Sequence, residues 1–303
     1  MLLGACAGAP QSFIVVAGER FPCAAHVIQW QDPQGFDAHS EKCHFSNAAL
    51  PRSAGPDTAT EKRYGVRSAR DLDAATQARV ASSGWDLPTL RERIDQFVMH
   101  YDVCLDSAQC FDVLHDQRGL SVHFLLDLDG TVYQTLDLAH RARHATKAND
   151  RSIGIEIAQI GAATKVEDLA RLYQHDTSGR LWLAIPQKTG APGFRGSGAL
   201  ARPSTEALHS GRINGTALVQ HDFTEEQYRS LAALISSVRT ALPRIEARVP
   251  VDTTGAVLDR CLDDAEFAAF HGVLGHYHVQ TNKSDPGPAF QWLRVLGLKS
   301  PSP

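Results

Sequence analysis

Residues 152–157 read Ser-Ile-Gly-Ile-Glu-Ile, and this stretch decides the fold predicted for the chain. Its three isoleucines recur at every second position, the spacing that places side chains on one face of a β-strand. Gly154 and Glu156 therefore share the opposite face. A carboxylate on an apolar strand wall can have a raised pKa and accept a proton, so Glu156 is a candidate catalytic residue. The alternative is a buried partner for an arginine.

Further strand-like runs lie on both sides of this stretch. The one near 97–99 ends at His100, and the one near 273–275 leads into His276. Between two others stands Asp129-Gly130, a dipeptide that supplies the positive φ angles of a tight hairpin turn. The runs are residues 97–99, 122–126, 131–136 and 273–275, with two shorter ones inside residues 12–30.

Helical patterns separate these strands. Thr224 can cap a helix in which Gln227 completes a capping box, and Pro243 marks its end. The predicted helices span residues 107–118, about 224–242, and a closing segment from Pro288. Strands interleaved with amphipathic helices predict an α/β fold, with a central mixed β-sheet flanked by α-helices.

The sequence divides into an extension and a main domain. Residues 1–90 include a polar stretch rich in Pro, Gly, Ser and Asp, which we expect to wrap around the domain formed by residues 91–298. Residues 161–222 carry many Gly, Ser, Pro and Arg residues with weak periodicity. We expect them to form a long insertion with little regular structure, of the kind that often serves as a lid.

Composition excludes two classes of partner. The chain has 303 residues, 21% of them charged, and a formal net charge of -4, so it has no basic surplus for binding nucleic acid. No apolar run approaches the roughly 18 residues that a membrane-spanning helix needs. The sequence is that of an ordinary globular domain.

The cysteines give a weak indication of location. Six cysteines without a C-x-x-C pair argue against a cysteine-rich structural zinc site. Two pairs are close enough in sequence to form disulfides, which would suit an exported protein, although reduced thiols fit the spacing equally well. The pairs are Cys104 with Cys110 and Cys23 with Cys43.

The first residues contain Leu3-Gly4-Ala5-Cys6, which resembles the lipobox of bacterial lipoproteins. This predicts a lipid anchor at Cys6 and a periplasmic or outer-membrane location. Only five residues precede the cysteine, fewer than a signal segment requires, so a chance match in a cytoplasmic protein is the alternative.

The 14 histidines offer candidate metal ligands. A catalytic zinc site uses three protein ligands and keeps a fourth position open. His100 and His276 each follow an apolar run, and Asp285 comes nine residues after the second histidine. Each histidine alone is more often a structural residue than a ligand.

In combination, five segments resemble the N-acetylmuramoyl-L-alanine amidase family, which includes AmpD-type enzymes and peptidoglycan recognition proteins. The resemblance covers about residues 91–297 and is most specific in the last segment. The segments are FVMHY at 97–101, LSVHFLLDLDGTVYQ at 120–134, RARHA at 141–145, NDRSIGIEIA at 149–158 and GHYHVQTNKSDPGPAFQW at 275–292.

This resemblance implies a zinc site and a reaction. It makes His100, His276 and Asp285 the ligands of Zn²⁺, a donor set that suits this metal. It also implies that Glu156 is the general base, that Lys283 faces the developing oxyanion and that His144 lies near the substrate. The implied reaction is hydrolysis of the amide between N-acetylmuramic acid and L-alanine in peptidoglycan or muropeptides. A surface role is the alternative for the lysine.

Four positions qualify the resemblance. Arg143 stands where the family commonly has tryptophan, and Val122 replaces a tyrosine of the recognition-protein branch, which favours the glutamate-based mechanism. We expect His278 to support a ligand and His123 to fill the core. The rival functions are a peptidoglycan-binding module without catalysis and a zinc amidase that acts on a different amide.

Overall fold

A six-stranded mixed sheet forms the centre of the computed structural model, which describes residues 12–46, 63–184 and 201–298. All neighbouring strands run parallel except β5 and β6, which are antiparallel partners. The predicted α/β class is confirmed. In spatial order the strands are β12 (Gly272–Gly275), β4 (Gln96–Tyr101), β7 (Ser152–Ile157), β5 (Phe124–Leu126), β6 (Val132–Gln134) and β3 (Val27–Gln29).

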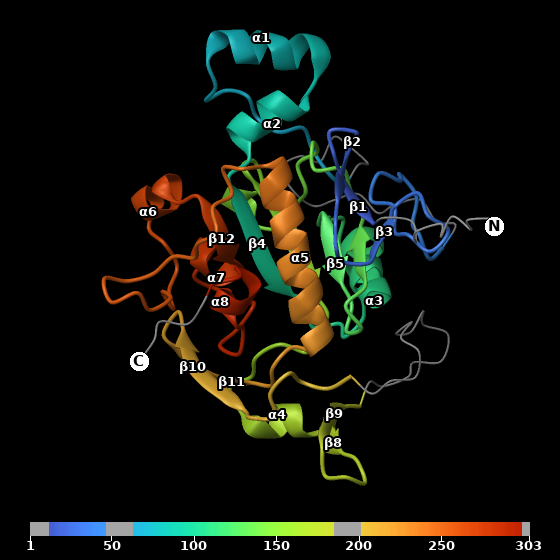
Figure 1. Ribbon diagram of the computed structural model, residues 1–303, viewed down its shortest axis with the longest axis vertical. Helices are drawn as coiled ribbons and strands as arrows, with labels where there is room; N and C mark the ends of the chain where they lie inside the picture. Colours follow the sequence, from blue (N-terminus) through green and yellow to red (C-terminus); the bar gives the residue numbers. More distant parts are fainter. Residues whose placement is uncertain (1–11, 47–62, 185–200, 299–303) are drawn as a thin grey trace, which may run out of the picture.

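One face of the sheet is covered by α5 (Glu225–Ala241), the long helix that crosses the sheet in Figure 1. Thr224 accepts a hydrogen bond from the Gln227 N–H, and the Gln227 side chain accepts one from the Thr224 N–H, so the predicted capping box is confirmed. The alternate side chains of β4 and β7 pack in the same core cluster as this helix. They are Phe97, Met99, Ile153, Ile155 and Ile157.

The opposite face is covered by shorter elements. The segment α3 (Ser107–Phe111) continues directly into the π-helical turn η1 (Asp112–Gln117) and packs against β5 and β6. Further along the sheet, α6 (Asp264–Ala269) packs against Val98 and Leu274. The helix predicted over 107–118 is therefore present as an α-helical and a π-helical part, and Asp106 caps its start.

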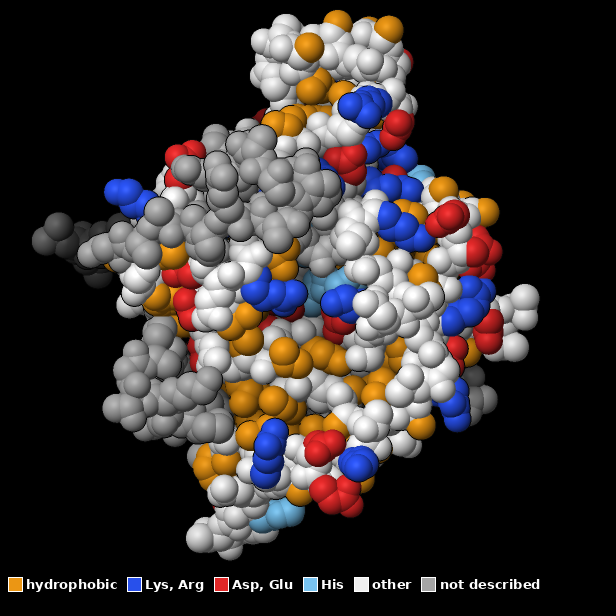
Figure 2. All heavy atoms as spheres, turned by 180° about the vertical axis from the view of Figure 1, so that it is seen from behind, with side chains coloured by type: hydrophobic (Ala, Val, Ile, Leu, Met, Phe, Trp, Pro, Cys, Tyr) orange, Lys and Arg blue, Asp and Glu red, His pale blue; other side chains and the backbone are white. Residues whose placement is uncertain are grey.

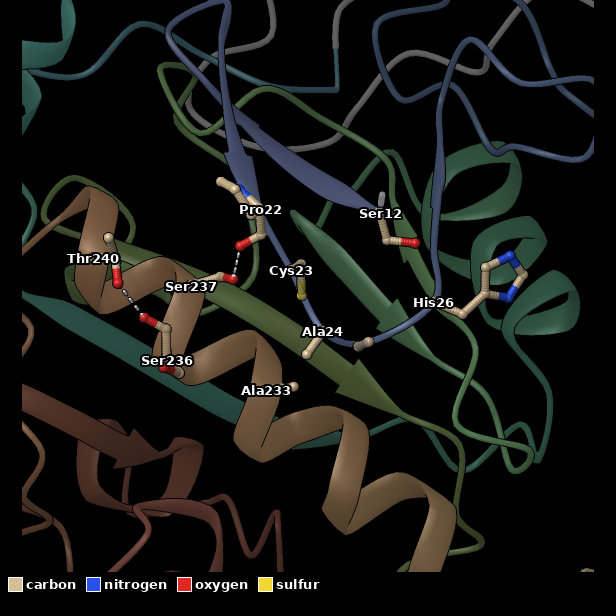
Figure 3. A pocket seen from close by; sticks show the side chains of 10 residues that line it. Ser12, Pro22, Cys23, Ala24, His26, Ala233, Ser236, Ser237 and Thr240 are labelled. Carbon is tan, nitrogen blue, oxygen red and sulfur yellow. Dashed lines mark hydrogen bonds between the residues drawn. The ribbon is translucent and has the colours of Figure 1, made fainter. Parts of the chain in front are cut away.

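The N-terminal residues complete the sheet and add a hairpin. Strand β3 is its edge strand, while β1 (Phe13–Val16) and β2 (Glu19–Pro22) form a separate hairpin against α5. Between this hairpin and the helix lies a groove of about 660 Å³, bordered by small side chains including Cys23, Ser237 and Thr240 (Figure 3). None of its lining residues is a predicted metal ligand or catalytic residue, and Cys23 is there only as a candidate for a disulfide.

Two further helices, α1 (Ala74–Ser83) and α2 (Leu87–Arg93), lie at the end of the sheet where β4 begins (Figure 1). At the other end, the carboxyl ends of the strands face the segments that follow β7. Helices α1 and α2 therefore lie at the opposite end of the sheet from His100.

The expectation that residues 161–222 have little regular structure is wrong for the described part of that segment. It holds one short helix and two antiparallel hairpins, all at the carboxyl ends of the sheet strands (Figure 1). Its elements are α4 (Val166–Ala170), β8 (Tyr173–His175), β9 (Leu181–Leu183), β10 (His209–Ile213) and β11 (Thr216–Gln220). The strands have only three to five residues each, joined by a two-residue turn between β10 and β11 and a five-residue turn between β8 and β9, so periodicity did not reveal them.

The closing helix is shorter than predicted. Helix α8 (Trp292–Val295) begins four residues after Pro288, and α7 (His276–Val279) is a single turn that directly follows β12. None of the helices in the described ranges is long and apolar enough to cross a membrane.

The expected disulfides are not confirmed. In the part of the chain that the structure describes, no disulfide joins Cys23 to Cys43 or Cys104 to Cys110, and the Cys104 and Cys110 side chains share a hydrogen bond. Burial raises the pKa of the Cys110 thiol. The lipobox-like residues lie outside the described ranges.

The turn between β5 and β6 generates a prediction about stability. Burial raises the pKa of Asp127 from 3.8 to about 7, so the folded chain keeps a proton that the unfolded chain releases. Between these values unfolding releases a proton, and stability falls as pH rises, by up to about 1.4 kcal/mol per pH unit. Asp127→Asn should remove this loss while keeping an acceptor for the Leu128 N–H.

The measurement is the urea unfolding free energy at pH 5 and pH 8. Asp168→Asn, at an exposed helical position, is the matched control. A wild-type protein and an Asp127→Asn variant with the same pH dependence would contradict the assignment.

Candidate functional site

Three predicted ligands converge at the carboxyl end of the sheet. His100, His276 and Asp285 are buried, and their nearest ligand atoms all lie within 4.8 Å of one another. Asp285 Oδ2 is 2.9 Å from His100 Nδ1 and 3.0 Å from His276 Nδ1. One oxygen of the Asp285 carboxylate thus contacts the Nδ1 atom of each of the two imidazoles.

Strand pairing explains this convergence. His100 is the penultimate residue of β4, and β12 is its parallel neighbour, with Gly275 opposite Met99. His276 therefore begins α7 close to His100, and the two rings lie 4.4 Å apart between centroids. The chain then loops back so that the Tyr277 N–H donates to the Asp285 carbonyl, which returns Asp285 to both histidines.

The site lies on the face of the sheet away from α5. His100 and Glu156 alternate with the side chains that pack under that helix, so both point to the opposite face. In the view from that side, histidine side chains are visible in a hollow, with cationic and acidic groups beside them (Figure 2).

Burial keeps the ligand set in the form that a metal needs. Burial, followed by the neighbouring His276, lowers the pKa of His100 to about 4, so its imidazole is neutral at pH 7. Burial raises the pKa of Asp285, but hydrogen bonds from both histidines outweigh this and hold it well below its usual range. A neutral imidazole and an ionised carboxylate are the states that coordinate a metal ion.

Glu156 stands directly opposite His100 in the register between β7 and β4. Its Oε1 atom is 4.0 Å from His100 Nδ1, and its side chain is 12% exposed. Burial raises the pKa of Glu156 well above its usual value, and the nearby carboxylates of Asp285 and Asp102 raise it further. A carboxyl group in this environment can exchange a proton with a molecule held beside the three ligands.

His144 contacts His100 directly. His100 Nε2 lies 3.0 Å from His144 Nδ1, and His144 Nε2 lies 3.3 Å from Ser152 Oγ. If His100 keeps Nδ1 free of a proton for a metal, then its Nε2–H donates to His144, whose own Nε2–H donates to the serine. The sequence did not predict this contact, and a role of His144 toward substrate stays a prediction.

Gln280 holds the second histidine in the same way. Its Oε1 atom lies 2.7 Å from His276 Nε2, so the His276 N–H at that position has an acceptor. Sequence reasoning missed this residue. The available signal was its spacing of four residues from His276, which brings two side chains together on a helical turn.

Lys283 lies within the electrostatic reach of the site. Its positive charge lowers the pKa values of both His100 and Glu156. Two residues before Asp285, it belongs to the same returning loop, which Tyr101 also reaches through a 2.5 Å contact between its hydroxyl and Ser284 Oγ. The structure thus brings together all five residues that the sequence singled out as ligands or catalytic groups.

His278 and His123, the two further histidines of the matching segments, make contacts with the backbone. His278 Nδ1 accepts from the Gly275 N–H and its Nε2–H donates to the Leu258 carbonyl, so it supports the residue before His276 without facing the ligand cluster. His123 Nδ1 accepts from the Gly154 N–H, and its Nε2 contacts the His140 carbonyl. Both are fully buried, as expected of core residues.

The donor set fits zinc. Two neutral imidazole nitrogens and one carboxylate oxygen are a common catalytic combination for Zn²⁺, and each imidazole has a hydrogen-bond partner on its other nitrogen. Within the described residues, this is the group of histidine, cysteine and acidic side chains placed to hold a metal ion.

Sequence similarity connects this chain with known proteins. Residues 90–288 match the model of a family described as N-acetylmuramoyl-L-alanine amidase. No curated protein matches the chain significantly. Solved structures with similarity to this chain include a selenomethionine derivative of AmpD, with 19% identity, 69% of this chain and 87% of that one covered, and a TM-score of 0.34.

Two further solved structures have similar values. LysC, an N-acetylmuramoyl-L-alanine amidase from Clostridium intestinale, has 17% identity over 69% of this chain and 89% of that one, with a TM-score of 0.36. AmiD from E. coli, solved with anhydro-N-acetylmuramic acid-L-Ala-D-gamma-Glu-L-Lys, has 18% identity over 69% and 59%, with a TM-score of 0.36. Likeness at this level carries no argument about activity.

The packing beneath His144 generates a prediction. A Cβ atom at Gly154 would lie 2.4 Å from His144 Nδ1, so Gly154→Ala should push the ring away from His100. Overpacking of this kind costs about 1–3 kcal/mol. We expect lower unfolding free energy and altered ring signals of both histidines in NMR spectra. Gly65→Ala, where the nearest atom would be 3.7 Å away, is the control. Unchanged ring signals would refute the contact.

Proposed function

Since this chain belongs to the N-acetylmuramoyl-L-alanine amidase family, we propose that it uses zinc to hydrolyse the amide between N-acetylmuramic acid and L-alanine in peptidoglycan or muropeptides. One observation carries the proposal. His100, His276 and Asp285 converge beside Glu156, and all four lie within the matched residues 90–288.

The ligands of the proposed metal are His100 Nδ1, His276 Nδ1 and the Asp285 carboxylate. Zinc in this site supplies a Lewis acid that polarises the scissile carbonyl and acidifies water. Three protein ligands leave room for substrate and water. A metal would replace the protons that Nδ1 of each histidine shares with Asp285, and the Nε2–H groups would then donate to His144 and Gln280, which orients both rings.

Glu156 is the proposed proton carrier. It takes a proton from the water that attacks the carbonyl carbon, and then returns a proton to the nitrogen of L-alanine as the C–N bond breaks. Its position 4.0 Å from His100 Nδ1 supports this role, because a molecule held at the ligands would be within reach. Its burial and neighbouring carboxylates make it a stronger base than an exposed glutamate.

Lys283 is the proposed oxyanion stabiliser. Negative charge develops on the carbonyl oxygen only during attack, so a fixed cation beside the site stabilises the transition state more than the substrate. The electrostatic effect of Lys283 on both His100 and Glu156 supports this placement. An exported location with a lipid anchor at Cys6 remains part of the proposal without support from the fold.

The first test measures zinc and product together. We expect the purified protein to contain zinc and to release free L-alanine amino termini from peptidoglycan, and a chelator should abolish the release. His276→Ala should reduce zinc content, whereas His175→Ala, at an exposed position, should not. Zinc without release would favour a binding module or a different amide, and full release after metal removal would overturn the zinc proposal.

The second test addresses the base. Glu156→Gln should keep zinc bound but lower the rate by about 10²–10⁴-fold, because the amide cannot accept the proton. Glu167→Gln, at an exposed position in α4, carries the same chemical change away from the site and should be fully active. A Glu156→Gln variant with wild-type rate would exclude the proposed role.

A further inference from the structure

The hairpin formed by β10 and β11 lies against the segment that carries His276, Lys283 and Asp285. Its tip, Asn214-Gly215, is a two-residue turn in which both residues have positive φ angles, 48° and 81°. This is the backbone that tight hairpins require and that asparagine followed by glycine adopts readily. The tip projects the Asn214 side chain away from the hairpin's own strands.

That side chain binds the metal-ligand segment at three points. Asn214 Nδ2 lies 3.3 Å from the Tyr277 carbonyl, 3.3 Å from the Gln280 carbonyl and 3.0 Å from the Lys283 carbonyl. The two N–H hydrogens of one amide are therefore shared among three acceptors. Two of these acceptors belong to α7 and the residue after it, where carbonyls at the end of a helix have no partner within the helix.

The rest of the Asn214 residue is anchored as well. Its Oδ1 atom accepts from the Cys261 N–H at 2.7 Å, and its own N–H donates to the Asp259 carbonyl at 2.8 Å. The amide is thus held in one orientation, with Nδ2 directed at the three carbonyls. A freely rotating side chain would not hold those carbonyls in place.

The base of the hairpin holds the far end of the same segment. Gln220, fully buried, donates from Nε2 to the Pro286 carbonyl at 3.0 Å and accepts from the Ala289 N–H at 3.0 Å. A Cβ atom at Gly287 would lie 2.1 Å from Gln220 Oε1, which shows how closely the two chains pass. The hairpin thus forms hydrogen bonds with both ends of residues 277–289, and Asp285 lies between the two sets of bonds.

We infer that Asn214 is a positioning residue, which sets the backbone of residues 277–283 so that His276, Gln280 and Asp285 meet in ligand geometry. The inference rests on the proposed function, since it concerns the same site. Asn214 touches neither the ligand atoms nor the catalytic groups, so it acts only through the backbone carbonyls. The β10–β11 hairpin of the insertion is therefore a support for the site.

The test compares metal binding by variants at the hairpin tip. Asn214→Gly keeps the positive φ angle at little cost and removes the amide, whereas Asn214→Asp keeps an oxygen for the Cys261 N–H and removes the donors. Asn282→Gly and Asn282→Asp, at an exposed position in the same segment, make identical changes next to the site. Zinc affinity is measured by competition with a chromophoric chelator, and the visible spectrum of the Co²⁺-loaded protein reports ligand geometry.

We expect both Asn214 variants to bind zinc about 10- to 100-fold more weakly and to show an altered Co²⁺ spectrum, as residues that orient ligands do. Both Asn282 variants should match the wild type. Wild-type affinity and spectrum in both Asn214 variants would overturn the inference.

Hydrogen exchange separates this inference from the proposed function. In the metal-free protein, Asn214→Gly should speed exchange of the Gln280 and Lys283 amides, which are bonded within the segment, while α5 stays protected. A wild-type protein that does not bind zinc would overturn the proposed function, and the exchange result would still decide the role of Asn214. Unchanged exchange in those two amides would count against that role.

Discussion

Parallel pairing of three strands is the constraint on which the site depends. β12, β4 and β7 run side by side in the same direction, so their carboxyl ends meet at one edge of the sheet. The register sets His100 opposite Glu156 and brings β12 to its end one residue before His276. A slip of one residue would turn Glu156 into the apolar core under α5, because successive side chains point to opposite faces. The register that buries the isoleucines of β7 under α5 therefore also places Glu156 beside His100.

Much of this arrangement was predictable because it depends on the pattern of residues close together in the sequence. Alternating isoleucines fixed which face of β7 carries Glu156, and the Thr224–Gln227 pair marked the start of α5. The ligand set was predictable only through the resemblance of its sequence segments to a known family. Strand ends alone left many histidines as candidates, since spacing says nothing about which distant residues meet.

What could not be predicted depends on contacts between distant residues. The contact between His100 and His144 joins positions 44 residues apart, and the Asn214 contacts with the metal-ligand segment join positions more than 60 apart. Strand β10 reads His-Ser-Gly-Arg-Ile, with one apolar residue, so its sequence lacks the apolar alternation that signals a half-buried strand. The irregular pattern belongs to a short hairpin that polar side chains hold in place. The expectation that this segment has little regular structure was therefore wrong.

Strand β3 belongs to the central sheet although it lies outside the residues that match the family. The family match begins at residue 90, yet β3 at residues 27–29 occupies the open side of β6, and the Gln134 side chain is bonded to both the N–H and the carbonyl of Val15. A chain cut at residue 90 would keep every proposed ligand but would leave β6 without a partner on the edge opposite β5. Exposed strand edges pair with other chains. The segment that precedes the family match thus covers a strand edge that would otherwise be open to pairing with another chain.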